Sequence, residues 1–373
     1  MLTTRTSWKN ALAAVLPDIA AKAEDHDRSG CFVSENIQRL KETGLSAAAV
    51  PDELGGFGCS QSELAEMLRM LGRACGSTAL AFSMHTHLAA TAAWRWRRDG
   101  SAEPLLQRVA DERLILVSSG GSDWIDGSCA LTKTDSGYLI SGRKVFASGS
   151  PAGDLLVTTG VLTTEEGPFV LHFPLALGAP GVERVDTWDT LGMRGTGSFD
   201  ILLSDVFVPE ESVSIRRPAG RWHEAIHLVT KIAIPLIYAV YGGIAEAARD
   251  TAVEMIRRRP AAAESEIAAG EIETLLHQLR LALADMIGLS EEGEPGFETS
   301  NRIMMSRSIA GETAIRTVEK ALEAAGGAGF YRRTGLERLF RDVQAARYHP
   351  LQLSPQRRLA GRIALGLDPD GGN

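Results

Sequence analysis

The chain has 373 residues, of which 44% are hydrophobic, so it is long enough for roughly two or three domains with buried cores. Its 39 lysines and arginines stand against 47 aspartates and glutamates. The resulting net charge of −8 argues against the strongly positive surface of a dedicated nucleic-acid-binding protein. The 4 cysteines lie far apart and lack the spacing of a zinc site or a disulfide framework, so we expect neither metal nor disulfides.

Two apolar stretches invite comparison with membrane or export signals. Residues 232–245 are too few for a membrane-spanning helix, and Pro235 and a pair of glycines interrupt them. Residues 11–21 lack the continuous apolar core of a signal peptide because Pro17 and Asp18 fall within them. We therefore expect a cytoplasmic protein that does not bind membranes.

Helical spacing of apolar residues characterises the first third of the chain. In residues 12–19 and 64–71 the apolar side chains recur every three or four positions, as on one face of an amphipathic helix. Residues 50–58 (Val-Pro-Asp-Glu-Leu-Gly-Gly-Phe-Gly) separate two such segments and have the composition of a loop. This pattern predicts an N-terminal helical domain over residues 1–110.

The middle of the chain has the pattern of a β domain. Short apolar or β-branched runs alternate there with turns rich in Gly, Asp and Pro. These runs are residues 114–118, 138–141, 155–159, 169–173 and 201–208. We predict an antiparallel β domain over residues 111–216.

The last third, residues 217–373, returns to helical spacing. Long helices are predicted over residues 226–258, 264–287, 298–325 and 335–347. Helices of this kind are expected to pack as a four-helix bundle. The order of helices, strands and helices is not the βαβ alternation of a doubly wound parallel sheet, so we predict an α+β fold.

The most informative segments are a glycine turn and a strand edge. The run 120–123 reads Gly-Gly-Ser-Asp, and the run 141–150 reads Ser-Gly-Arg-Lys-Val-Phe-Ala-Ser-Gly-Ser. On a regular strand, Phe146 and Ser148 would share one face because side chains alternate with period two. An aromatic ring, a hydroxyl and closely approaching glycine backbone favour the binding of a flat heterocycle, whereas the alternative is ordinary core packing of a phenylalanine.

Several motifs, taken in their order, resemble the acyl-CoA dehydrogenase superfamily over nearly the whole chain. They are the loop at 50–56, the Gly-Ser-Asp turn, the Gly-Arg-Lys run with Phe and Ser beyond it, Leu-Gly-Met-Arg-Gly-Thr at 191–196, Asp-Val-Phe-Val-Pro at 205–209, Gly-Gly-Ala-Gly-Phe at 326–330 and Leu-Glu-Arg-Leu-Phe-Arg-Asp at 336–342. The resemblance implies an N-terminal helical domain, a middle β domain and a C-terminal four-helix bundle. It also implies a flavoprotein oxidoreductase that forms a homotetramer or homodimer.

The resemblance also implies which residues bind the flavin. By position, Phe146 flanks the flavin ring, Ser148 lies near its N5, and Ser122 belongs to the cofactor-binding turn. The family's glycine-rich turn, which lies by the phosphate and adenosine end of the cofactor in a neighbouring subunit, is matched by Gly326, Gly327 and Gly329. A helix C-cap is the alternative interpretation of those glycines. FAD is the expected cofactor and FMN the alternative, because the adenosine contacts are only partly matched.

Two positions depart from the dehydrogenases of the superfamily, in which a Glu abstracts the proton α to a thioester carbonyl. Alignment through residues 341–342 puts Pro350 at the position of that Glu, directly after His349. In members that carry the base on the helix opening the C-terminal domain, the corresponding residue is Ala233. Neither side chain can accept a proton, which argues against ordinary dehydrogenation of a fatty acyl-CoA.

The remaining imidazole and hydroxyl groups resemble the flavin-dependent monooxygenase branch of the superfamily, the dibenzothiophene monooxygenase-like enzymes. This resemblance implies that a flavin C4a-(hydro)peroxide, formed from O₂, oxygenates a small organic substrate, with a CoA thioester as one option. It places His85 or His87, together with His349, against the flavin C4a, and Ser148 near the peroxide. Imidazole can donate a hydrogen bond to a peroxide oxygen and exchange a proton near neutral pH. Because the sequence has no nicotinamide-binding fingerprint, a separate flavin reductase is expected.

Two other functions stay open. The first is an acyl-CoA dehydrogenase whose base has moved, with Glu224 and Asp189 as candidates. The second is a non-catalytic flavin-fold protein that binds a ligand or acts as a scaffold. Arg194 and Thr196 are further candidates for contact with a substrate phosphate, although turn structure and a surface ion pair are the favoured interpretation.

Overall fold

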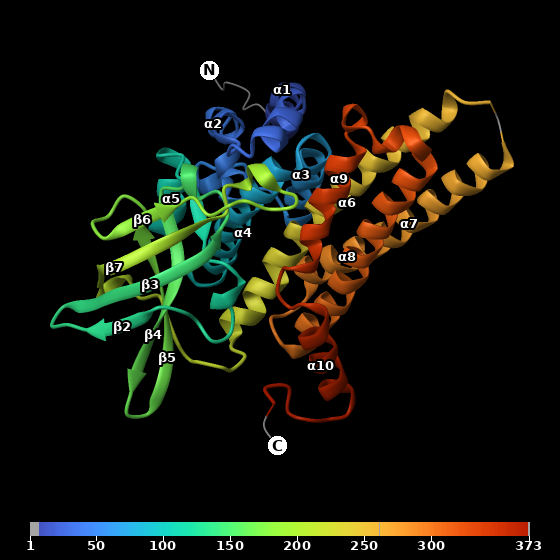
Figure 1. Cartoon of the computed structure of the whole chain (residues 1–373). Coiled ribbons are helices and arrows are strands. Elements are labelled where there is room, and N and C mark those ends of the chain that lie inside the picture. The colour runs from blue at the N-terminus through green and yellow to red at the C-terminus, as the bar shows by residue number, and fades with distance from the viewer. Residues whose placement is uncertain (1–6, 261, 372–373) are drawn as a thin grey trace.

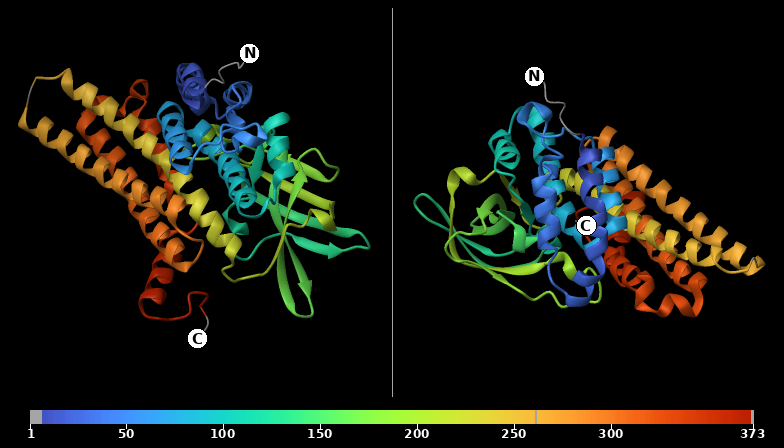
Figure 2. Two further views of the ribbon diagram at one scale, coloured as in Figure 1. Left: turned by 180° about the vertical axis from the view of Figure 1, so that it is seen from behind. Right: turned by 90° about the horizontal axis from the view of Figure 1, so that it is seen from above.

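Three regions follow one another along the chain and lie side by side in space (Figure 1). The N-terminal helices contact both the β domain and the C-terminal helices (Figures 1 and 2). The computed structural model describes residues 7–260 and 262–371, and the side chain of Ser122 lies outside the described part. The order of helices, sheet and helices confirms the predicted α+β fold.

The N-terminal region is helical, as predicted. Its α-helices are α1 (Trp8–Ser29), α2 (Ser34–Glu42), α3 (Gln61–Ala74), α4 (Gly76–Asp99) and α5 (Glu103–Asp111). A capping box begins α3, because the Ser60 side chain accepts from the backbone N–H of Glu63 and the Glu63 carboxylate accepts from the backbone N–H of Ser60. Two short 3₁₀ turns, η1 (Leu45–Ala47) and η2 (Asp52–Leu54), form the loop before α3.

Helix α4 is the element that connects the three regions. It packs against α3, against α6 of the C-terminal region and against strand β1 of the sheet. Nearly every residue from Gly76 to Ala93 is buried, so the helix is surrounded by protein on all sides. Side chains from the middle of α4 can therefore reach the boundary between the sheet and the bundle.

The β domain is a single eight-stranded sheet. Its strands are β1 (Leu116–Ser118), β2 (Ala130–Lys133), β3 (Gly137–Ala147), β4 (Leu155–Thr164), β5 (Gly167–Ala176), β6 (Val182–Val185), β7 (Phe199–Pro209) and β8 (Ile215–Pro218). They are ordered β6-β7-β3-β2-β4-β5-β8, with β1 beside β4. The prediction of an antiparallel domain is wrong for two pairings, because β4 runs parallel to both β1 and β2. These pairs join strands separated by long connections, which a hairpin pattern in the sequence does not reveal.

The C-terminal region consists of α6 (Glu224–Arg257), α7 (Ala263–Glu292), α8 (Phe297–Ala325), α9 (Leu336–Val343) and α10 (Leu353–Ala364). The first three are long and pack on one another, and the short α9 fills the fourth place of the bundle against α6 and α8. The predicted helix over residues 335–347 is thus shorter than expected, and it ends in a 3₁₀ turn, η9 (Gln344–Arg347). Helix α10, which we did not predict, packs on α8.

Helix α6 forms the centre of the bundle. Among the described residues it is the one helix that is long and apolar enough to span a membrane, yet 94% of its most apolar 18-residue window is buried within the protein. The helix continues through Pro235 and through Gly242 and Gly243, which the sequence suggested as interruptions. Gly243 allows this close packing, because a Cβ there would lie 2.1 Å from the carbonyl oxygen of Arg69 on α3.

Candidate functional site

The glycine turn after β1 forms a cradle between the sheet and the C-terminal region. The backbone N–H of Gly120 donates to the carbonyl of Val145 at 3.2 Å. A Cβ on Gly120 would lie 2.3 Å from that carbonyl oxygen, and a Cβ on Gly121 would lie 2.7 Å from Cγ of Pro350. The turn therefore has no room for side chains, and it brings the end of β3 and the loop carrying His349 together. We call Gly120 and Gly121 the glycine cradle.

Phe146 lies at the edge of this cradle and is 57% exposed. The pairing of β3 with β7 shifts register between Lys144 and Ala147, and Phe146 has a positive φ of 59° within that irregularity. Its ring packs edge-on against Trp188, with centroids 5.7 Å apart. Alternation along a regular strand was therefore the wrong reason to pair Phe146 with Ser148, because a bulge intervenes and Ser148 follows the end of β3.

Ser148 belongs to a chain of hydroxyl groups. Its Oγ lies 2.7 Å from Oγ of Ser198, which lies 2.8 Å from Oγ1 of Thr196. Thr196 in turn donates to the carbonyl of Met193 at 3.0 Å. Ser198 and Thr196 are buried, whereas Ser148 is half-buried at the outer end of the chain. The sequence analysis missed Ser198, and the sequence signal that points to it is the hydroxyl pair in Thr-Gly-Ser.

Behind the cradle, a buried ion pair fixes the turn to the sheet. Lys144 Nζ donates to Oδ2 of Asp123 at 2.8 Å and to the carbonyl of Thr159 at 2.7 Å. The same ammonium contacts the carbonyl and the hydroxyl of Ser128, each at 2.9 Å. Asp123 also accepts from the hydroxyls of Ser128 and Thr158. The polar groups of this pair are therefore fully engaged. The neighbouring Ser122, predicted to bind the cofactor, has its side chain outside the described residues.

His349 lies in the loop after η9, next to Pro350, which packs on the cradle. Its Nε2 is 2.5 Å from the hydroxyl of Tyr241 on α6. Its carbonyl accepts from Nη2 of the buried Arg307 on α8 at 2.6 Å. Burial, together with the nearby Arg307 guanidinium, lowers the pKa of His349 to about 3. The imidazole is therefore neutral over the physiological range of pH, which makes it a hydrogen-bonding group and not a charged one.

The two histidines of α4 differ in their hydrogen bonds. His85 Nε2 donates to the carbonyl of Ser46 at 2.6 Å, and its Nδ1 accepts from the backbone N–H of Leu116 at 3.0 Å. Both ring nitrogens thus hold α4 to η1 and β1, which gives His85 a structural role. His87 is buried as well, but its Nδ1 has no hydrogen-bond partner. Burial lowers the pKa of each imidazole to about 4. Of the two, His87 is the one with a buried ring nitrogen that has no partner.

The glycines assigned to the adenosine end lie at the C-terminus of α8, in the 3₁₀ turn η7 (Gly326–Phe330). Gly326 has a φ of 63°, and Arg259 donates to the carbonyls of Ala324 and Ala325. These features are those of a helix C-cap. The turn also presents Phe330, which is 89% exposed. Contact of Gly326, Gly327 and Gly329 with the cofactor of a neighbouring subunit stays a prediction.

The candidates for a relocated base lie on the surface. Glu224 pairs with Arg98 at 3.2 Å, and the Asp189 side chain is 98% exposed with Arg194 at 3.6 Å. Arg194 also donates to the carbonyl of Asp27, at 2.9 Å. These contacts favour the turn and surface ion-pair interpretation for Arg194, and they show both carboxylates paired at the surface.

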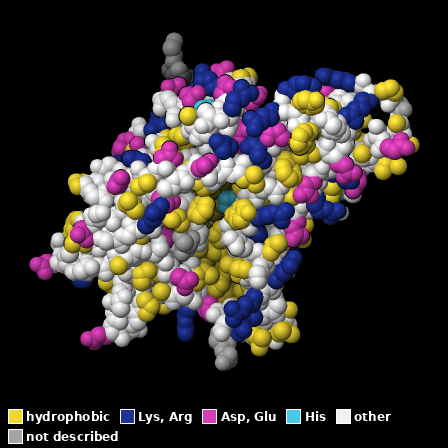
Figure 3. Space-filling model, in the orientation of Figure 1, with side chains coloured by type: hydrophobic (Ala, Val, Ile, Leu, Met, Phe, Trp, Pro, Cys, Tyr) yellow, Lys and Arg dark blue, Asp and Glu magenta, His cyan; other side chains and the backbone are white. Residues whose placement is uncertain are grey.

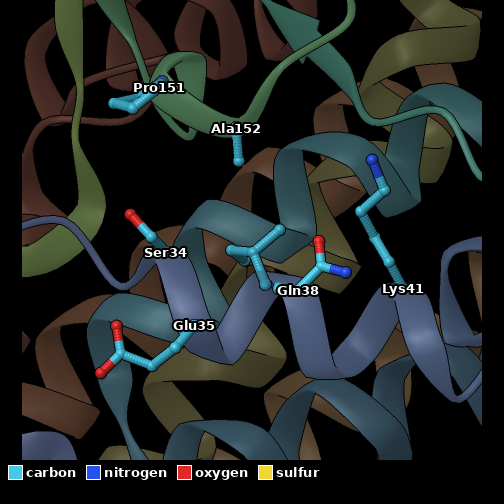
Figure 4. A pocket seen from close by; sticks show the side chains of 7 residues that line it. Ser34, Glu35, Gln38, Lys41, Pro151 and Ala152 are labelled. Atoms are coloured by element: carbon cyan, nitrogen blue, oxygen red, sulfur yellow. The ribbon is translucent and has the colours of Figure 1, made fainter.

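Figure 3 shows where the surface is hollowed. Between the β domain and the C-terminal helices, hydrophobic side chains gather in a depression, and a histidine is visible at its upper end. A second pocket, of about 460 Å³, lies between α2 and the 3₁₀ turn η4 (Ser150–Ala152). Figure 4 shows Gln38 and Lys41 of α2 facing Pro151 and Ala152 across it. The residues that line it include none of the predicted flavin contacts.

Comparison with known proteins identifies the family. Residues 5–113 match the family model described as "Acyl-CoA dehydrogenase, N-terminal domain", and residues 236–352 match "Acyl-CoA dehydrogenase, C-terminal domain". The chain belongs to the acyl-CoA dehydrogenase family, and it is a flavin-dependent oxidoreductase, as its relatives are. The predicted superfamily and enzyme class are thereby confirmed.

Two nitrososynthases are among the relatives that this chain resembles over nearly its full length. L-evernosamine nitrososynthase from Micromonospora sp. is 31% identical over 96% of this chain and 90% of its own length. Amino sugar nitrososynthase DnmZ from Streptomyces peucetius is 29% identical over 95% of this chain and 92% of its own length. Among solved structures, KijD3 in complex with FMN and dTDP-3-amino-2,3,6-trideoxy-4-keto-3-methyl-D-glucose has a TM-score of 0.89 and 31% identity, covering 97% of this chain and 93% of that one.

The residues at the cradle fit a flavin. The glycine cradle leaves backbone without side chains for the close approach of a flat ring. Phe146 offers an exposed aromatic face, and Ser148 offers a hydroxyl at the end of its chain. The buried, unpartnered Nδ1 of His87 is a polar atom that lacks the hydrogen bond buried groups normally make. These groups are suited to the flat, polar-edged isoalloxazine, and they would hold it between the sheet and the C-terminal loop.

Proposed function

We propose that the protein is a flavin-dependent N-oxygenase that acts on the amino group of an amino sugar carried on a nucleotide. In this reaction one atom of O₂ enters the amine and the other leaves as water, with two electrons supplied by the reduced flavin. The relatives of about 30% identity over nearly the full chain support this substrate class, since their names specify amino sugars. The neighbouring KijD3 complex supports FMN over the FAD expected from the sequence.

The observation that carries the proposal is the chemistry of the side chains around the cradle. The alignment inferred from the sequence motifs puts Pro350 at the position of the dehydrogenase Glu, and Pro350 packs on Gly121. The polar groups on the segments that meet at the cradle are the neutral imidazole of His349 and the Ser148 hydroxyl, and His87 on α4 is a further neutral imidazole. With pKa values lowered to about 4 and about 3, these imidazoles are weak bases, and the serine hydroxyl is a hydrogen-bonding group. They suit the stabilisation of an oxygen species more than the deprotonation of a thioester.

The chain's own residues would orient the reactants and limit access of water. The glycine cradle and Phe146 would position the flat ring, while Ser148 and His349 would hydrogen-bond at its reactive edge. The hydrophobic depression in Figure 3 would exclude bulk water from the reacting atoms, which strengthens those hydrogen bonds. We further propose that a separate reductase delivers the reduced flavin, and that the protein works in the cytoplasm as a homotetramer or homodimer.

Isotope labelling tests this proposal. The protein is supplied with FMN, a flavin reductase, NADH, ¹⁸O₂ and a dTDP-linked 3-amino deoxysugar, and the product is analysed by mass spectrometry. We expect ¹⁸O in the sugar product and none with the sugar that lacks the amino group. Bleaching of the bound flavin by an acyl-CoA without air, with no labelled product, would instead establish a dehydrogenase.

A matched pair of variants assigns the role of His349. His349→Gln should lower oxygenation about a hundredfold if the imidazole contacts the reacting oxygen. His277→Gln is the control, because His277 lies exposed on α7. Equal turnover of the two variants would remove His349 from the mechanism without affecting the substrate assignment.

A further inference from the structure

We propose that Tyr241 is a positioning residue that holds His349 as the tautomer with its proton on Nδ1, so that the imidazole presents an N–H donor on the side of the ring opposite Tyr241. The role of that donor in oxygenation rests on the function proposed above. The tautomer itself is a property of the chain and can be measured without flavin or substrate.

The first step concerns the direction of the hydrogen bond. Tyr241 is fully buried on α6, and its hydroxyl makes no other hydrogen bond among the residues that the structure describes. A buried phenol without an acceptor would bear the cost of an unsatisfied donor. The Tyr241 O–H therefore donates to His349 Nε2. A nitrogen that accepts cannot also carry the proton, so in the neutral ring the proton lies on Nδ1.

The protonation states of both groups agree with this direction. Burial raises the pKa of Tyr241 well above its ordinary value, with Tyr238 adding to the effect. The pKa of His349 lies at about 3, for the reasons given above. A neutral phenol thus meets a neutral imidazole. Tyr238, Tyr241 and Arg307 are the titratable or charged groups that pack on the His349 ring or its backbone in the described chain.

The backbone of the loop is fixed independently of Tyr241. Arg307 donates to the carbonyl of His349 at 2.6 Å and to the carbonyl of Ala346 at 3.3 Å. The hydroxyl of Tyr238 donates to the same Ala346 carbonyl at 2.7 Å. Pro350 then packs on Gly121. Loss of the Tyr241 hydroxyl should therefore free the imidazole ring while the loop keeps its place.

The ring nitrogen opposite Tyr241 is open. His349 Nδ1 makes no hydrogen bond to any residue in the described ranges, and the residue keeps part of its surface exposed although burial dominates the surroundings of its ring. His85 shows the reverse arrangement, since its Nε2 donates and its Nδ1 accepts. The chain thus holds two neutral histidines in opposite tautomers. In His85 both nitrogens are used within the fold, whereas in His349 one donor is left for a ligand.

The test is ¹⁵N NMR of histidine-labelled protein without flavin, with the His349 signals identified by their loss in His349→Gln. We expect Nδ1 of His349 to show the shift of a protonated nitrogen and Nε2 that of an unprotonated one. In Tyr241→Phe the tautomer ratio should move toward Nε2–H, and in the control Tyr331→Phe, which removes an exposed tyrosine hydroxyl, it should not change. A wild-type protein with Nε2–H, or an unchanged ratio in Tyr241→Phe, would overturn the proposal.

A second readout links the tautomer to activity. Tyr241→Phe should lower oxygenation about tenfold, the effect of roughly one hydrogen bond, while the dissociation constant for FMN stays within about twofold. A residue with only a structural role would instead weaken FMN binding and lower the unfolding temperature. If the labelling experiment finds no oxygenation at all, the proposed function is wrong. The tautomer proposal is then still tested by the NMR measurement.

Discussion

The two sides of the glycine cradle differ in how far their polar groups are satisfied. Behind the cradle, Lys144 and Asp123 are buried and make hydrogen bonds through every polar group. Outside this network, His349 and His87 each keep a ring nitrogen without a partner among the described residues. A saturated network sets the shape of a site, whereas open hydrogen-bonding groups are available to a ligand. The four predictions below test this contrast, from the largest expected effect to the smallest.

Breaking the buried ion pair behind the cradle should have the largest effect on stability. Lys144→Met leaves Asp123 as an unpaired buried carboxylate, so we expect the free energy of unfolding to fall by about 4 kcal/mol. Urea unfolding of the variant and the wild type measures this. In the double variant Lys144→Met with Asp123→Asn the loss should shrink, because no buried charge remains. A loss below about 1 kcal/mol for the single variant would show that the pair does not hold the turn.

Acid should weaken the fold through its buried histidines. The pKa values of His85 and His87 lie at about 4 and those of His172 and His349 at about 3. Because these values are depressed, the unfolded chain binds protons first as the pH falls below about 6.5, and stability is lost between that pH and the folded-state values. Asp342 opposes this, since burial raises its pKa to about 6. Between about pH 7 and pH 5.5 we expect a net loss of about 4 kcal/mol in urea unfolding, and constant stability would contradict the burial of these rings.

Substitution of His85 on α4 should lower stability, whereas substitution of His87 on the same helix should lower activity. His85→Leu leaves the Ser46 carbonyl and the Leu116 N–H unpaired, so the free energy of unfolding should fall by about 2 kcal/mol. His87→Leu removes a buried atom without a partner, so stability should change by less than about 0.5 kcal/mol, while oxygenation falls. Urea unfolding and turnover of both variants measure this. The opposite pattern would place His85, and not His87, at the reacting atoms.

A methyl group in the cradle should act mainly on cofactor binding. In Gly121→Ala the new Cβ would meet Cγ of Pro350, so the loop carrying His349 must shift. We expect about tenfold weaker binding of FMN, measured by quenching of flavin fluorescence, with a loss of stability of about 1 kcal/mol. Gly178→Ala is the matched control, since a Cβ there meets nothing within 4 Å. Equal affinity of the two variants would place the flavin elsewhere.

The sequence was sufficient for the architecture, because periodicity reports which faces are buried. It predicted three of the four bundle helices over most of their length, and it placed the sheet between the two helical regions. The motif order then indicated the family that the comparisons confirmed. The parallel pairing of β4 with β1 and β2 could not be read this way, because pairing between distant strands is decided by tertiary packing.

The site was predicted less completely, because hydrogen-bond partners depend on elements far apart in the chain. His85 and His87 are equivalent in the sequence, and only the contacts of His85 with Ser46 and Leu116 separate them. The positive φ of Phe146 arises from a bulge that the local sequence pattern does not predict. The link between His349 and the cradle is likewise tertiary, since it runs through Pro350 and Gly121.

A crystal structure of the protein with FMN tests the central claim most directly. The account predicts the isoalloxazine over Gly120 and Gly121, with the Phe146 ring against one face. It also predicts His349 Nδ1 within hydrogen-bond distance of the flavin or of a water at its reactive edge. An isoalloxazine bound elsewhere, or a carboxylate from another part of the chain at the position expected for His349, would contradict it.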